Sequence, residues 1–127
     1  MKLSVLSVLQ TIVACGLLNV WLVRPRMKTS FRGGDASNIF EEFKAYGLPE
    51  WSCYLVGTLK VGCALLLLVG LWDSSLALPA AALILALMVG AVGMHIKVKD
   101  PLFKSLPAIT MLVLSGAICV LTLSSSF

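Results

Sequence analysis

Four long apolar runs divide the chain and limit how it can fold. They cover residues 3–23, 51–72, 76–95 and 107–124, and each contains 18 to 22 residues. A helix needs about 20 residues to cross the hydrocarbon core of a bilayer. Since backbone groups in lipid must find their hydrogen bonds within the chain, each run is expected to be a helix. The pattern predicts an all-α integral membrane protein with a single transmembrane domain over residues 1–127.

The connections between the runs predict an antiparallel four-helix bundle. Only Asp73, Ser74 and Ser75 separate the second run from the third, so these helices are expected to be antiparallel neighbours. The third and fourth runs are joined by residues 96–106, and Pro107 opens the fourth run, where its missing N–H costs little.

The longest connection, residues 24–50, contains a short amphipathic pattern over residues 38–46. Asn38 can cap a helix there because Glu41 follows three residues later. The apolar residues share one face and the charged residues lie elsewhere: Ile39, Phe40, Phe43 and Tyr46 on the apolar face, and Glu41, Glu42 and Lys44 off it. Such a helix either lies at the interface with the lipid headgroups or packs on the bundle, and the pattern leaves both arrangements open.

The composition excludes an ordinary soluble domain. Hydrophobic residues make up 59% of the chain and charged residues only 13%, whereas soluble domains carry about a quarter charged residues. The net charge of +4 could indicate nucleic-acid binding, but the positive charges lie in short segments between apolar runs. Because no basic stripe is interleaved with stacking aromatics, we expect the lipid bilayer, and no nucleic acid, as the partner.

Lysine and arginine residues assign the two sides of the membrane. The connections over residues 24–50 and 96–106 hold eight of them, whereas the opposite side holds only Lys2. The eight are Arg24, Arg26, Lys28, Arg32, Lys44, Lys97, Lys99 and Lys104. By the positive-inside rule both basic connections are expected in the cytoplasm, with the bacterial inner (plasma) membrane as the location.

The first run resembles a cleaved signal in one respect, because the letters IVAC at residues 12–15 are similar to a lipoprotein processing box. The sequence then stays apolar from Gly16 to Val23, apart from Asn19, and no small-x-small site follows. We therefore expect an uncleaved spanning helix.

Four cysteines and one histidine give no metal-site pattern. Cys15, Cys53, Cys63 and Cys119 fall in or beside apolar runs, and there is no C-x-x-C motif. Cys53 and Cys63 would lie about 15 Å apart on one helix, which is too far for a disulfide. We expect four small buried apolar residues and no metal, with a thiol redox role as the alternative.

Lys60 places a cationic amine inside the second apolar run. It lies nine residues into the predicted helix, about 13 Å below its cytoplasmic end, where an unpaired charge costs about 2.5–3.5 kcal/mol. None of the six acidic residues lies within an apolar run, so an internal ion pair is not expected. The amine could snorkel toward the cytoplasmic face and fix helix packing, or it could bind an anionic or quinone-like group inside the bundle.

Other polar residues could contact the same ligand. Helical side chains lean toward the helix N-terminus, which directs Lys60 toward Glu50 and His95 at the same boundary. Ser115 lies at a similar depth on the fourth helix, whereas Gln10 lies deeper on the first. As the only histidine, His95 cannot build a multi-histidine metal or haem site; it either faces the headgroups or exchanges protons with the ligand.

Small residues predict where helices approach one another closely. Ala82, Ala86 and Gly90 repeat every four residues as a small face on the third helix. Gly57 lies on the mostly small face of the second helix that also carries Lys60, and we expect this face to point inward.

Aromatic residues mark the two ends of the second helix. Trp51 and Tyr54 lie at its start and Trp72 at its end, which are the positions of interfacial anchors. Anchoring accounts for all three, and no further function is assigned to them.

Several segments together resemble the DoxX-like family of small four-helix membrane proteins. The resemblance spans residues 40–115 and rests, in this order, on FEEFKAYGLPEW, LVGTLKVGCALLLLVGLW, LPAAALILALMVGAVGMHIKVKDP and LPAITMLVLS. It implies an antiparallel four-helix membrane bundle. Many relatives carry glutamate in the slot that Lys60 occupies, so the charge at this slot is reversed here.

The resemblance implies an accessory role more directly than it implies catalysis. The family is named after a subunit of a thiosulfate:quinone oxidoreductase, and other relatives resemble assembly or redox-stress partners. We expect an accessory, assembly or partner-binding subunit that holds a lipid, quinone-like or anionic group near Lys60, with a larger membrane complex as a partner. A quinone-linked oxidoreductase subunit is the alternative. A small transporter or channel is a second alternative, which the lack of intramembrane acids and internal repeats disfavours.

Overall fold

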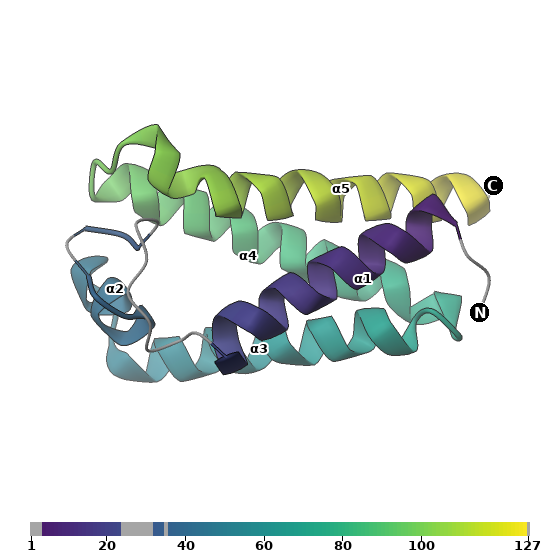
Figure 1. Cartoon of the computed structure of the whole chain (residues 1–127), viewed down its shortest axis with the longest axis horizontal. Coiled ribbons are helices and arrows are strands. Elements are labelled where there is room, and N and C mark those ends of the chain that lie inside the picture. The colour runs from purple at the N-terminus through teal and green to yellow at the C-terminus, as the bar shows by residue number, and fades with distance from the viewer. Residues whose placement is uncertain (1–3, 24–31, 35, 127) are drawn as a thin grey trace.

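The computed structural model describes residues 4–23, 32–34 and 36–126, and within them it contains helices and no strand. The α-helices are α1 (Val5–Leu18), α2 (Ile39–Ala45), α3 (Glu50–Val69), α4 (Ala77–Lys97) and α5 (Leu106–Ser126) (Figure 1). Shorter turns extend three of them: the π-helical turn η1 (Asn19–Val23) follows α1, and the 3₁₀ turns η2 (Ser74–Leu76) and η3 (Leu102–Ser105) precede α4 and α5. The basic residues Lys2, Arg24, Arg26 and Lys28 lie outside the described residues.

Within the described residues, four helices are long and apolar enough to cross a membrane, which confirms the predicted all-α membrane bundle. With their flanking turns they cover Val5–Val23, Glu50–Val69, Ser74–Lys97 and Leu102–Ser124. Leu55 and Leu65 on the outer side of α3 are at least half exposed, and lipid tails are as apolar as these side chains. Trp51, Tyr54 and Trp72 are exposed at the ends of α3, and their role as interfacial anchors stays a prediction.

Local capping contacts set where α1 begins and where α2 begins and ends. Ser4 Oγ accepts the Ser7 N–H at 3.2 Å, and Ser7 Oγ accepts the Ser4 N–H at 2.8 Å, so two backbone donors are satisfied. Asn38 Oδ1 accepts the Glu41 N–H at 2.9 Å and caps α2 as predicted. Gly47 has φ +78° and ends α2, because glycine adopts this left-handed conformation without steric cost.

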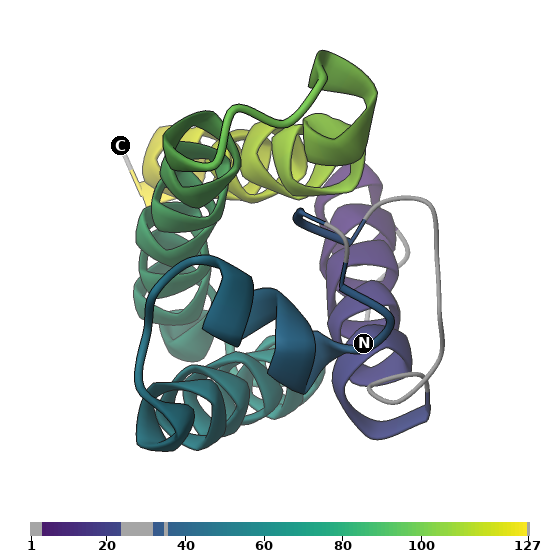
Figure 2. The ribbon, with the colours of Figure 1, turned by 90° about the vertical axis from the view of Figure 1, so that its left-hand side faces the viewer.

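The long helices form a ring in which neighbours are antiparallel. α1 packs against α3 and α5, and α4 packs against the same two helices. α1 begins and α5 ends at the end of the bundle that holds the α3–α4 turn, and α2 lies across the opposite end (Figures 1 and 2). α2 packs on the bundle, which is one of its two predicted arrangements: Ile39 and Phe43 are buried beside Cys53 of α3.

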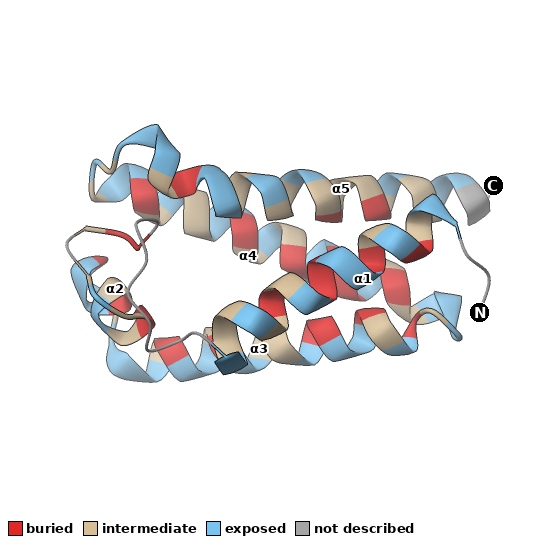
Figure 3. Cartoon of the chain, viewed as in Figure 1, coloured by how far each residue is buried: buried red, intermediate tan, exposed pale blue. Residues whose placement is uncertain are grey.

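The apolar core fills the half of the bundle nearest the α3–α4 turn. It consists of Val13, Ala14, Leu17, Cys63, Ala64, Leu67, Ala80, Ala81, Ile84, Met88 and Ile118. The inward face predicted for α3 is mostly buried (Figure 3). Large apolar side chains are exposed on the outside of the bundle. Gln10 is buried in this half and donates from Nε2 to the Leu67 carbonyl at 3.0 Å. The polar side chain thereby satisfies a carbonyl near the end of α3.

The small face predicted on α4 differs from the structure. Ala82 and Ala86 are exposed, and a Cβ added at Gly90 would meet nothing within 4 Å, so this face is not a close contact between helices of the chain. Ala82 faces away from the core, because each residue turns a helix by about 100°, whereas Ala86 and Gly90 line the cavity described below. The buried side of α4 instead runs through Ala77, Ala80, Ala81, Ile84, Met88 and His95.

The four cysteines are free thiols. Cys53 and Cys63 are buried and Cys119 is half-buried, as expected of small apolar residues. Cys15 is exposed, contrary to the expectation, because it lies on the side of α1 that faces away from the core.

Gly57 on α3 packs tightly against Trp21 of η1, and this contact can be tested. A Cβ added at Gly57 would lie 2.7 Å from Cε3 of the Trp21 ring, whereas a Cβ at Gly62 on the same helix meets nothing within 4 Å. Gly62→Ala should therefore gain up to about 1 kcal/mol from helix propensity. Gly57→Ala should lose about 1–3 kcal/mol through overpacking. Dodecyl sulfate titrations followed by circular dichroism measure both variants, and equal free energies of unfolding would contradict the contact.

Candidate functional site

A cavity of about 490 Å³ occupies the half of the bundle that the apolar core leaves open. Its walls come from α1, η1, α2, α3, α4 and α5. The helix α2 lies across this end of the bundle (Figure 2). Most lining side chains are apolar, and the polar ones are Arg32, Glu42, Tyr46, Lys60, His95 and Lys104. This volume, and an apolar wall with a few polar groups, are typical of small-molecule sites.

The amine of Lys60 lines this cavity and forms no ion pair with any residue that the structure describes. Lys60 is 8% exposed, and its Nζ lies 5.2 Å from the centroid of the Trp21 ring, within range of a cation–π contact. Among residues 4–23, 32–34 and 36–126, no ion pair or hydrogen bond to this amine is formed. The cation–π contact, at about 1–2 kcal/mol, offsets only part of the cost of the buried charge. The amine therefore keeps its N–H donors for a ligand.

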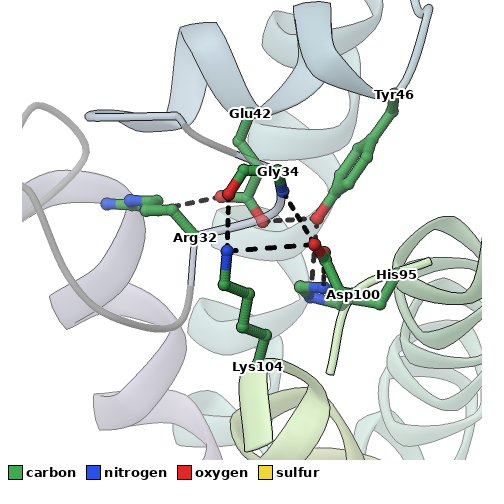
Figure 4. A network of polar contacts seen from close by, with 7 residues as sticks. All are labelled: Arg32, Gly34, Glu42, Tyr46, His95, Asp100 and Lys104. Atoms are coloured by element: carbon green, nitrogen blue, oxygen red, sulfur yellow. Dashed lines mark hydrogen bonds and ion pairs between the residues drawn. The ribbon is translucent and has the colours of Figure 1, made fainter. Parts of the chain in front are cut away.

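A chain of polar contacts crosses the end of the cavity beneath α2 (Figure 4). Arg32 Nη1 lies 3.3 Å from Glu42 Oε2, and Tyr46 Oη donates to Glu42 Oε1 at 2.6 Å. Tyr46 Oη also lies 3.4 Å from Nε2 of His95. These contacts join the loop before α2, α2 itself and the last turn of α4.

Asp100 ties the connection between α4 and α5 into the same network. Its side chain is buried, with Oδ2 at 2.8 Å from His95 Nδ1, and Oδ1 accepts the Gly34 N–H at 3.0 Å. Lys104 Nζ lies 3.9 Å from Asp100 Oδ1 and donates to the Gly34 carbonyl at 2.5 Å. One carboxylate thus holds both loops over the end of the cavity (Figure 4).

The geometry also assigns the protons in this network. Burial and then the negative charge of Glu42 raise the pKa of Tyr46, so the hydroxyl keeps its proton and donates it to Glu42. The Tyr46 oxygen can then only accept from His95 Nε2, and the Asp100 carboxylate can only accept from Nδ1. The ring of His95 is thereby held between the Tyr46 hydroxyl and the Asp100 carboxylate.

The structure brings two of the five predicted ligand contacts together. Lys60 and His95 both line the cavity, and their contact with a ligand stays a prediction. Gln10 and Ser115 are hydrogen-bonded to backbone carbonyls in the closely packed part of the bundle, and Glu50 is exposed at the start of α3. These three lie outside the cavity because sequence spacing gives the depth of a residue and not the direction in which its helix face points.

Sequence patterns did not point to several residues of the site, among them Trp21, Glu42, Tyr46 and Asp100. The amphipathic pattern places Glu42 on the polar face of α2, yet its carboxylate lines the cavity. One signal was present, because Tyr46 carries a hydroxyl on an otherwise apolar helix face and a buried hydroxyl requires a partner. Trp21 carried no comparable signal, since its contact with Lys60 depends on how η1 crosses α3.

Removal of the Asp100 charge should loosen the loops over the cavity. Asp100→Asn keeps the shape of the side chain but weakens the bonds from His95 and Gly34, at a cost of about 1.5–3 kcal/mol in the free energy of unfolding. Asp73→Asn is the matched control, because Asp73 is exposed and caps η2, where asparagine caps as well as aspartate. Dodecyl sulfate titrations compare the two variants, and a similarly small change in both would refute the role of Asp100.

Comparison with known protein families identifies the family of this chain. The model of the DoxX-like family matches residues 27–118, which is most of the chain and includes α2, α3, α4 and part of α5. No curated protein and no solved structure gives a significant match. The match confirms the resemblance seen in the sequence, and the chain belongs to the DoxX-like family.

Proposed function

We propose that the protein holds a ligand with an anionic or hydrogen-bond-accepting group against Lys60, inside the membrane-spanning bundle. One observation supports this above others: a buried amine lines the cavity and lacks a protein partner in the part of the chain that the structure describes. An unpaired charge in the bilayer costs about 2.5–3.5 kcal/mol. Packing alone would not require a charged residue here, because methionine would fill a similar volume without the cost of a buried charge.

An accessory or partner-binding subunit is the role we propose for this binding. The other polar groups of the cavity, the Arg32–Glu42 pair and His95, could hold a bound group in one orientation beside Lys60. A bundle of this kind would retain the ligand for a larger membrane complex. Co-purification of one such complex with the tagged chain would support the role.

A quinone-linked oxidoreductase subunit is the second candidate, and one feature favours it. Lys60 on α3 and His95 on α4 are donors on different walls of the same cavity. A quinone has two carbonyl oxygens on opposite sides of its ring, which two such donors could bind. A quinone spectrum in the purified protein would favour this candidate.

The distribution of basic residues supports a proposal for the orientation. The described cations other than Lys60 lie at the α2 end of the bundle: Arg32, Lys44, Lys97, Lys99 and Lys104. We propose that the connections over residues 24–50 and 96–106 face the cytoplasm of a bacterial inner membrane, in line with the positive-inside rule.

Substitution of Lys60 should release the ligand without unfolding the bundle. Lys60→Met removes the amine, so a molecule that co-purifies with the wild-type protein from its native membrane should be lost. Lys44→Met is the matched control, because Lys44 is exposed on α2 and does not line the cavity. Mass spectrometry of organic extracts measures the bound molecule in each preparation. Retention of the same molecule, in the same amount, by Lys60→Met would sink the proposal.

The same substitution should stabilise a ligand-free preparation. Loss of the buried charge recovers about 2.5–3.5 kcal/mol, and loss of the cation–π contact forfeits about 1–2 kcal/mol. The free energy of unfolding of Lys60→Met should therefore rise by about 0.5–2.5 kcal/mol in a dodecyl sulfate titration. Lys44→Met should change it by less than about 0.5 kcal/mol. A clear loss of stability in Lys60→Met would mean that the lysine stabilises the bundle through its packing contacts.

A further inference from the structure

A second hollow lies across Trp21 from the Lys60 cavity. This groove of about 540 Å³ is formed by η1, α2 and α3. Trp21 and Ile39 line both the groove and the cavity, so their side chains form the wall between the two spaces. The two spaces are therefore neighbours separated by the thickness of these side chains.

Three contacts hold the Trp21 ring in this wall. The ring packs on Gly57, where an added Cβ would lie 2.7 Å from it, and its centroid lies 5.9 Å from that of Phe43 in an edge-to-face arrangement. On the cavity side, Lys60 Nζ lies 5.2 Å from the ring centroid. Trp21 also belongs to the π-helical turn η1, and such turns are frequent at functional sites.

The groove offers a hydrocarbon surface at the depth of the membrane. Besides the Trp21 indole, polar side-chain atoms in its lining come from Cys53, Tyr54 and Thr58. Thr58 Oγ1 already donates to the Tyr54 carbonyl at 2.8 Å within α3, and Cys53 is buried. Because the groove runs along a membrane-spanning helix, a hydrocarbon chain could enter it from the surrounding lipid.

The described residues that line the Lys60 cavity, in contrast, carry an excess of positive charge. Within this part of the chain, Arg32, Lys60 and Lys104 line it together with one carboxylate, that of Glu42. The described cations still outnumber the described carboxylates when Asp100, which lies behind His95, is included. This balance favours an anionic group over a neutral carbonyl as the partner of the free amine.

We infer that the ligand is an anionic lipid with a single hydrocarbon chain, whose acidic head contacts Lys60 and whose chain lies in the groove beyond Trp21. The inference rests on the proposed function of Lys60 and adds the class of ligand and the site of its chain. A carboxylate and a phosphate monoester both supply the charge and the acceptor oxygens that the amine lacks. Trp21 is a positioning residue, because its ring separates the site of the head from the site of the chain and has to turn aside for one ligand to occupy both.

Native mass spectrometry of the full chain in a neutral detergent tests both halves of this ligand. Stearate or dodecyl phosphate should bind with one molecule per chain. Methyl stearate, which lacks the charge, and inorganic phosphate, which lacks the chain, should each bind at least about tenfold more weakly. Lys60→Met should weaken stearate binding by a similar factor, since an ionic hydrogen bond is lost.

A leucine placed in the groove tests the chain site by itself. Gly62 lines the groove and Gly93 lines neither space, and an added Cβ at either meets nothing within 4 Å. Both substitutions to leucine should therefore fold, but only Gly62→Leu should weaken stearate binding, by about tenfold or more. Gly93→Leu should bind as the wild type does.

Each contrary result has a distinct meaning. Equal stearate affinities for Gly62→Leu and Gly93→Leu would overturn the chain site, and equal affinities for stearate and methyl stearate would overturn the anionic head. Inorganic phosphate that binds as tightly as dodecyl phosphate would show a site for a free anion and overturn the lipid assignment. If Gly62→Leu weakens stearate binding but Lys60→Met does not, the proposed function of Lys60 is refuted, and the groove still holds the hydrocarbon chain. A wild-type chain that binds neither lipid would overturn the inference.

Discussion

One amine that has no counter-ion among the described residues lies where two unlike halves of this bundle meet. Lys60 shares the inward face of α3 with Cys63 and Leu67, which pack in the apolar core one and two turns further along. An ammonium group cannot pack in the same way, because its desolvation is costly unless donors find acceptors. The helices therefore close on one another near the α3–α4 turn and leave a cavity of about 490 Å³ near α2, with the amine on its wall and the Trp21 ring beside it.

The network beneath α2 closes the polar end of the same cavity. A helix of seven residues is too short to persist alone, so α2 depends on its contacts with the rest of the chain. Ile39 and Phe43 supply the apolar part of these contacts, and Glu42 and Tyr46 supply the polar part. Asp100 completes the arrangement from the opposite loop, and in this way charged groups at the membrane boundary are paired with one another and not with Lys60.

Trp21 links the two halves of the proposed binding arrangement. Its indole faces a cation on one side and lies against a groove of mainly apolar side chains on the other. Gly57 makes this position available, because any larger residue there would occupy the space of the ring. The Trp21 ring separates a polar environment from an apolar one. A ligand with a charged head and an apolar chain would match the two environments.

The amino-acid sequence by itself determined the four spanning helices, the cap and stop of α2 and the presence of a buried amine. Hydropathy, capping side chains and glycine conformation act over a few neighbouring residues, so they can be read from local patterns. The lean of helical side chains also directed Lys60 toward His95, and both residues line the cavity. Only the tertiary structure decided how each helix is rotated about its axis. That rotation carried Ala82 out of helix contact, turned Glu42 into the cavity and brought Trp21 to the amine, because it results from the packing of all the helices together.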